Sequence, residues 1–202
     1  ALTMPPTQFQ AWLSEHPELL SSRGATKGEL LSQYRGALDL AKAVRRSPYL
    51  YGVIRRSKKQ VILTGTLQGM PVRVMMDLLD KDTSIYDLKS MRDFSSKYNP
   101  VSEEWQDWWA YWDYAMQLYI YREIARQNGM SVPHVGLIAG SKSDLDVQAL
   151  TFGDEIMNAA AADTEYTLDR MDKILAGSEE PQSCGVCPWC LCHKKITAFT
   201  EI

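Results

Sequence analysis

The 202-residue sequence lacks long apolar runs, a strong charge bias and scattered cysteines. No apolar run reaches the roughly 18 residues of a membrane-spanning helix, and no signal peptide is visible, so we expect a protein without membrane contact. The formal net charge of −3 gives no general attraction to nucleic acid, so any DNA site has to be local. The absence of a glycine-rich phosphate loop argues against ATP use.

The few cysteines all lie near the C-terminus, at Cys184, Cys187, Cys190 and Cys192. A disulfide framework would spread its cysteines along the chain, whereas clustering at two-residue gaps is typical of metal ligation in a reducing cytoplasm. Thiolates suit zinc or an iron–sulfur cluster, and Cys192 or His193 could complete a zinc site. Four free thiols in a mobile tail are the alternative.

The hydrophobic pattern predicts an α/β fold. We expect helices over residues 7–14, 28–47, 103–127 and 154–175, and strands over 61–67, 71–79, 84–89, 134–139 and 147–152. This order predicts a mixed central sheet flanked by helices. We expect one domain over residues 1–178 and a cysteine-containing tail over 179–202. Four tryptophans of the predicted helix 103–127 form an apolar stripe, which favours core or subunit interface over base stacking.

Two acids and a lysine lie on neighbouring predicted strands. Asp77 closes one apolar run, and Asp87 and Lys89 share a face of the next strand. Carboxylates and the Leu88 carbonyl are oxygen ligands of the kind that Mg²⁺ or Mn²⁺ prefers. Lys89 would orient a water and offset charge on a phosphorane-like transition state. As an isolated pattern, it is more often a pair of solvated acids at a strand end with a surface lysine.

The predicted helix 103–127 adds an amide and a phenol. Gln117 and Tyr121 are one turn apart, so they share a face of the helix and can reach a phosphate together. Alone, the pair fits a helix that buries Tyr121 and exposes Gln117. Following the two acids and the lysine in this order, it favours a catalytic constellation.

The chain resembles the PD-(D/E)XK nuclease superfamily, and within it the RecE-type and lambda-type exonucleases of phages and prophages, through three motifs: Met76-Asp77, Asp87-Leu88-Lys89 and Gln117-x-x-x-Tyr121. The stretches around Lys59–Gly65 and Ile85–Phe94, with the tail Cys184-x-x-Cys187-x-x-Cys190, resemble an uncharacterised phage-associated branch of that group. The resemblance covers about residues 15–202.

This resemblance implies a restriction-endonuclease-like core and Mg²⁺-dependent exonuclease digestion of double-stranded DNA ends, 5′-to-3′, in the bacterial cytoplasm. It further implies a homo-oligomer that feeds a single-strand annealing protein in recombination. Relatives carry an N-terminal region that we do not find here, so we expect a chain lacking that part. Lys58 stands where relatives often have an acid, which leaves a third metal carboxylate unassigned.

Two other functions fit the same residues. One is a structure-selective endonuclease with the same centre, and the other is a catalytically silent DNA-binding or assembly protein on the same fold. In each case we expect the DNA backbone to meet a basic stretch just before the first predicted strand, at Arg55, Arg56, Lys58 and Lys59.

Overall fold

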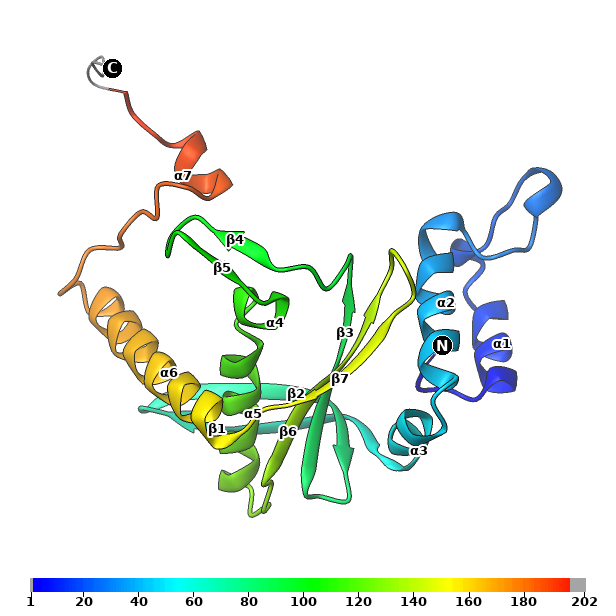
Figure 1. Ribbon diagram of the computed structural model, residues 1–202, viewed down its shortest axis with the longest axis horizontal. Coiled ribbons are helices and arrows are strands. Elements are labelled where there is room, and N and C mark those ends of the chain that lie inside the picture. Colours follow the sequence, from blue (N-terminus) through cyan, green and yellow to red (C-terminus); the bar gives the residue numbers. More distant parts are fainter. Residues whose placement is uncertain (1, 197–202) are drawn as a thin grey trace.

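The computed structural model describes residues 2–196, and its centre is a five-stranded sheet (Figure 1). The strands lie in the order β1-β2-β3-β6-β7. Their bounds are β1 Lys58–Leu67, β2 Met70–Asp80, β3 Ser84–Met91, β6 His134–Ser141 and β7 Val147–Thr151. β3 and β6 run parallel, and the other neighbours in this sheet run antiparallel. The predicted mixed sheet flanked by helices is confirmed.

A tight hairpin joins the first two strands. Gln68 and Gly69 both have positive φ, 47° and 81°, between the paired residues Leu67 and Met70. Two consecutive left-handed residues form the turn whose twist matches that of a two-stranded ribbon. The local sequence thereby sets the register that carries Asp77 along β2.

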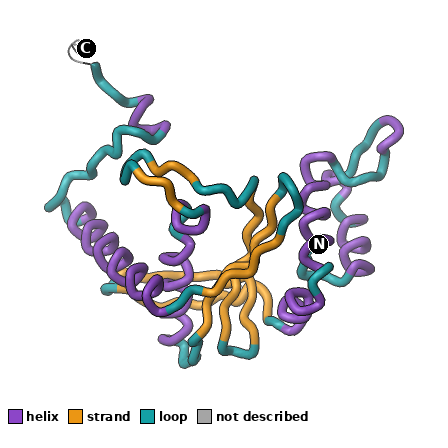
Figure 2. The backbone as a smooth tube through the Cα atoms, viewed as in Figure 1, coloured by secondary structure: helices purple, strands orange, loops and turns teal. Residues whose placement is uncertain are grey.

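Helices cover both faces of the sheet (Figure 1). On one side lie α1 (Pro6–Ser14), α2 (Ser32–Arg45) and α3 (Pro48–Arg56), and on the other lie α5 (Tyr114–Gln127) and α6 (Asp154–Leu175). The larger apolar core packs under α5, and a smaller one forms between the sheet and α2 and α3. Figure 2 shows the strands passing between these two groups of helices.

The N-terminal helices differ from the prediction. The helix expected over 28–47 begins only at Ser32, because Leu30 forms a β-bridge with Leu20. Two short 3₁₀ turns, Pro17–Leu19 and Gly24–Thr26, precede it. Pro48 then begins a helix that was not predicted, α3, where it occupies the first turn and the Ser47 side chain accepts a hydrogen bond from the Leu50 N–H.

The single helix predicted over 103–127 is wrong in its first half. A two-stranded sheet, β4 (Lys97–Asn99) and β5 (Glu104–Gln106), is followed by the short α4 (Trp108–Tyr111) and then by α5. Asp113 takes a left-handed conformation, φ 52°, between the two helices. The tryptophans therefore do not form one stripe, since Trp108 is buried and Trp105 is 73% exposed.

The remaining element, α7 (Pro188–Cys192), lies in the C-terminal segment. Within residues 2–196, none of the helices combines the length and the apolar character needed to cross a bilayer.

Candidate active site

A break in the β-ladder positions the first acid, Asp77. Gln60, opposite Asp77 in the β1–β2 register, has a left-handed φ of 51°, and this pair is missing from an otherwise continuous ladder. Side-chain alternation slips at the same point, because Met76 packs in the core under α5 and Leu78 packs in the core under α2 and α3. At this kink Asp77 departs from the regular alternation of side chains between the two faces of β2.

The opening between β2 and β3 lets Asp77 contact the neighbouring strand. Ladder pairing between these strands ends at Leu78 and Tyr86, and the next N–H of β3 that faces β2, that of Leu88, donates to Asp77 Oδ2 at 2.9 Å. The N–H and C=O of one strand residue point to the same neighbour. The Leu88 carbonyl therefore also faces the opening beside Asp77.

Asp87 is a buried acid, with its side chain 4% exposed. Burial raises the pKa of the Asp87 carboxyl above its ordinary value, the Lys89 ammonium offsets part of this rise, and the nearby charge of Asp77 adds to it. Asp87 Oδ2 lies 2.6 Å from Lys89 Nζ as an ion pair, but among the described residues no donor has hydrogen-bond geometry to this oxygen.

Three groups hold the ammonium of Lys89. It pairs with Asp87, donates to Gln117 Oε1 at 2.9 Å, and lies 4.3 Å from the centroid of the Tyr114 ring. Its side chain is only 18% exposed. These contacts hold the ammonium between Asp87 on β3 and the side chains of α5.

One face of α5 completes the cluster. Gln117 Nε2 donates to Asp87 Oδ1 at 3.2 Å and to the Tyr121 hydroxyl oxygen at 2.7 Å. Burial raises the pKa of Tyr121 above its ordinary value, which already lies well above neutral pH, so the hydroxyl carries its proton. In the described part of the chain no residue accepts that proton. Tyr114, which the sequence analysis did not select, shares this face at i, i+3 and i+7 with the other two. That spacing was the signal for it.

The structure thus brings together the five predicted residues of the centre, Asp77, Asp87, Lys89, Gln117 and Tyr121. Their donor set fits a hard divalent cation, because two carboxylates and a carbonyl are oxygen ligands and Asp87 Oδ2 has no aligned donor. Within the described residues, no third acid, histidine or cysteine joins Asp77 and Asp87 in a group with ligand atoms closer than 4.8 Å. The roles of these residues stay a prediction.

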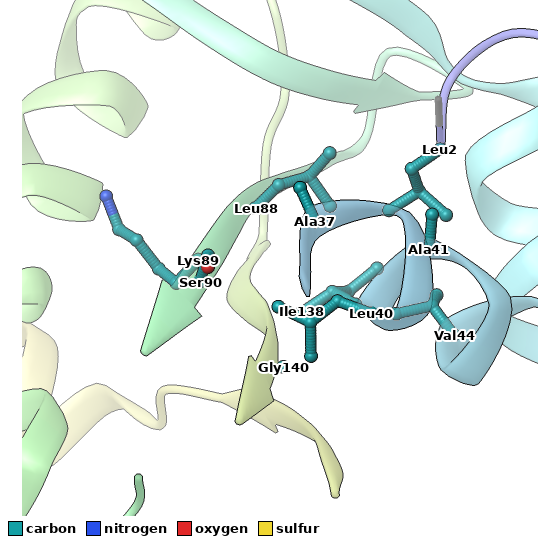
Figure 3. A pocket seen from close by; sticks show the side chains of 10 residues that line it. All are labelled: Leu2, Ala37, Leu40, Ala41, Val44, Leu88, Lys89, Ser90, Ile138 and Gly140. Atoms are coloured by element: carbon teal, nitrogen blue, oxygen red, sulfur yellow. The ribbon is translucent and has the colours of Figure 1, made fainter. Parts of the chain in front are cut away.

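The opposite face of β3 is apolar. A cavity of about 150 Å³ lies there between α2, β3 and β6, lined mainly by Leu40, Val44, Leu88 and Ile138 (Figure 3). Figure 3 shows the Lys89 side chain pointing away from it. The cavity is therefore separate from the polar cluster.

The predicted DNA-contacting residues are mostly engaged within the protein. Arg56 makes a two-armed ion pair with the buried Asp80, at 2.7 Å, and Lys58 pairs with Asp82 at 2.7 Å. Lys59 donates to two backbone carbonyls. Arg55 is exposed, with its guanidinium 6.0 Å from the centroid of the Tyr51 ring. Their role in DNA binding stays a prediction.

Three of the four cysteines converge. The Sγ atoms of Cys184, Cys187 and Cys190 lie within 4.8 Å of one another, and Cys192 lies outside this group. Hydrogen bonds from Ser183 and Cys187 lower the pKa of the Cys190 thiol to about 6. The convergence supports the expectation of a metal site at this end of the chain.

The comparisons with known proteins identify a family for the chain. A sequence model of a family described as "PDDEXK-like domain of unknown function (DUF3799)" matches residues 3–193. The match runs past residue 178, where the predicted domain ends. No curated protein matches the chain.

Two solved structures are similar to the chain. The first is a "Putative exonuclease" from Eubacterium rectale, with a TM-score of 0.75 and 24% identity over 96% of this chain and 72% of that chain, a likeness that shows the fold. The second is the crystal structure of SSO0001, with a TM-score of 0.37 and 16% identity over 94% of this chain and 80% of that one, which is too low to support an argument.

Proposed function

Because the chain belongs to the family of PDDEXK-like domains, we propose that it is a metal-dependent deoxyribonuclease that degrades duplex DNA from its ends. The observation that carries the proposal is the convergence of two acids on β2 and β3 with Lys89 and with Gln117 on α5. The fold is shared with a "Putative exonuclease", which supports end-directed rather than internal cleavage. The finer proposal is 5′-to-3′ degradation by a homo-oligomer, feeding a single-strand annealing protein in phage-type recombination.

Asp77, Asp87 and the Leu88 carbonyl would hold Mg²⁺ or Mn²⁺. When bound, such an ion supplies the Lewis-acid chemistry that hydrolysis of a phosphodiester requires. The ion would also favour the charged form of Asp87, whose pKa burial raises.

The other side chains would act on the water and the phosphate. Hydrolysis adds a water oxygen to phosphorus and breaks the bond to a sugar oxygen, which leaves with a proton. Lys89 would orient the water and offset the negative charge that develops on the phosphate. Gln117 accepts a hydrogen bond from Lys89 and donates one to the Tyr121 oxygen, so it would position Lys89 and leave the Tyr121 hydroxyl proton for a phosphate oxygen.

Linear and covalently closed circular duplexes of the same sequence test the proposal. With Mg²⁺ or Mn²⁺, we expect the wild-type chain to degrade the linear DNA and spare the circle, and Asp87→Ala to degrade neither. Labels at the 5′ or the 3′ end report the polarity. Asp87→Ala removes a metal ligand rather than apolar packing, so circular dichroism should show an unchanged fold.

Two outcomes would contradict the proposal. Circles cut as fast as linear DNA would indicate the structure-selective endonuclease. DNA bound but not degraded with either metal would indicate the catalytically silent binding protein, a function favoured by the lack of a third carboxylate beside Asp77 and Asp87 among the described residues.

A further inference from the structure

The ring of Tyr114 contacts the charged end of Lys89, and the proposed function gives this ring no role. The Lys89 ammonium lies over the ring, 4.3 Å from its centroid, and the lysine side chain is largely buried. A cation over the face of an aromatic ring is attracted by the ring quadrupole, more strongly where water is excluded. Burial raises the pKa of Tyr114, and the nearby charge of Asp87 adds to this rise, so the ring is that of a neutral phenol. Tyr114 therefore attracts the ammonium without carrying a charge.

Partners other than Lys89 fix the Tyr114 ring. It packs edge-on against the ring of Trp108 in α4, with centroids 6.0 Å apart and planes at 65°. Trp108 is buried, and its indole N–H donates to Gln148 Oε1 on β7 at 3.2 Å. The Tyr114 hydroxyl donates to Met91 Sδ at the end of β3, at 3.5 Å. These contacts, from α4 and β3, place the ring independently of the lysine.

An aromatic ring suits this position better than another oxygen acceptor. An ammonium has three N–H groups, and in the described part of the chain only Gln117 Oε1 accepts one of them in hydrogen-bond geometry. Asp87 pairs with the ammonium as well, but its carboxylate is also a proposed metal ligand. A further carboxylate would neutralise the lysine and occupy another N–H group. The ring attracts the charge and leaves N–H groups for the water and the phosphate.

We propose that Tyr114 is a positioning residue whose ring keeps the Lys89 ammonium directed toward the reacting water and phosphate. This role rests on the proposed nuclease function, and it adds a residue that lies outside both the two-acid motif and the pair of Gln117 and Tyr121. The ring acts through Lys89 and not on DNA itself. Its loss should therefore lower kcat, whereas KM for linear duplex DNA should stay unchanged.

Fluorinated phenylalanines incorporated at position 114 test the role, because each fluorine weakens the attraction of the ring for a cation and hardly changes its shape. Tyr114→Phe keeps the ring and should degrade linear DNA with close to the wild-type kcat. Rings with increasing numbers of fluorines should lower kcat stepwise, and Tyr114→Leu should lower it by about 3- to 30-fold. Tyr119→Leu, which removes the ring beside Arg122 on another face of α5, is the matched control and should keep the wild-type kcat.

Nuclear magnetic resonance of isotope-labelled lysine measures the contact without DNA, metal or activity. The methylene protons beside the Lys89 nitrogen lie near the face of the ring, so the ring current should shift their signal upfield in the wild type and in Tyr114→Phe. In Tyr114→Leu the signal should return to the position of exposed lysines such as Lys142. Lys89→Gln removes the signal and thereby assigns it. Circular dichroism should show that each variant is folded.

Three results would overturn the proposal. Tyr114→Leu with the wild-type kcat would show that Lys89 needs no ring. Fluorinated rings that all match Tyr114→Phe, beside a slow Tyr114→Leu, would reduce Tyr114 to a packing residue. A Lys89 signal without an upfield shift would show that the ammonium does not lie over the ring in solution.

Failure of the proposed function has a different signature. A wild-type chain that shows the upfield shift of Lys89 but degrades no linear DNA with Mg²⁺ or Mn²⁺ would refute the nuclease function, and the positioning role of Tyr114 with it.

Discussion

At the residue scale, the centre depends on a carboxylate in an unfavourable position. Asp87 is buried and its pKa is raised, although Lys89 lies beside it. An apolar residue would serve packing better there, since a buried ion pair often stabilises less than an apolar group of the same volume. Ionisable groups whose pKa is shifted by burial and by specific partners gather at functional sites. This combination supports the proposal that Asp87 belongs to the site rather than to the core.

Two tyrosines of α5 provide a matched pair at the same scale. Tyr121→Phe removes a hydroxyl that faces the site, and we expect degradation of linear DNA to slow by about 10- to 100-fold, because one hydrogen bond to developing charge is lost. Tyr119→Phe, whose ring lies beside Arg122, should leave the rate unchanged. Single-turnover rates at saturating metal measure both variants. Equal rates for Tyr121→Phe and wild type would remove Tyr121 from the site.

At the element scale, locally encoded features were predictable. The strands of the hairpin and helix α6 follow from alternation, from the Gln68-Gly69 turn and from regular helical spacing. The break before α5 was not predictable, because Trp108 and Trp112 keep helical spacing up to it, and the turn between the two helices consists of Trp112 and the left-handed Asp113. Apolar periodicity does not report a turn that a non-glycine residue makes.

The same distinction applies to the site. The approach of Asp77 to Asp87 could be predicted from antiparallel strands, because residues across a hairpin pair at set positions. The kink at Gln60 and the Tyr114 ring over Lys89 could not. Helical spacing puts Tyr114 on the face of α5 that carries Gln117 and Tyr121, but the position of its ring over Lys89 depends on how α5 packs on the finished sheet, and no local pattern signals the left-handed Gln60.

The close approach of β6 and β7 gives a prediction about these elements. A Cβ at Gly136 would overlap the Leu150 carbonyl oxygen, so we expect Gly136→Ala to lower the free energy of unfolding by about 1–3 kcal/mol. Gly36→Ala, in α2 with nothing near its Cβ, should instead raise it by up to about 1 kcal/mol. Urea unfolding measures both. A neutral Gly136→Ala would show that the two strands separate at little cost.

At the scale of the whole molecule, most of the arginine and lysine side chains predicted to contact DNA near the start of β1 are already paired within the protein. The net charge is −3, and Asp80 and Asp82 pair with Arg56 and Lys58 at the start of β1. In the described chain no carboxylate pairs with Arg55. A DNA-binding surface at this edge would therefore depend on a small number of residues.

Arg55 and Arg56, adjacent in sequence, separate DNA binding from stability. We expect Arg55→Ala to weaken binding of duplex DNA and to reduce by about 1 the slope of the logarithm of the binding constant against that of salt concentration, because one phosphate contact is lost. Its unfolding temperature should not change.

Arg56→Ala should lower the unfolding temperature, because the buried Asp80 loses its guanidinium partner. Salt titrations in which Ca²⁺ replaces Mg²⁺, to keep the DNA uncleaved, measure binding. Thermal unfolding measures stability. If Arg55→Ala binds DNA with an unchanged salt slope, the phosphate backbone does not pass over the end of α3, and the contact lies elsewhere on the molecule.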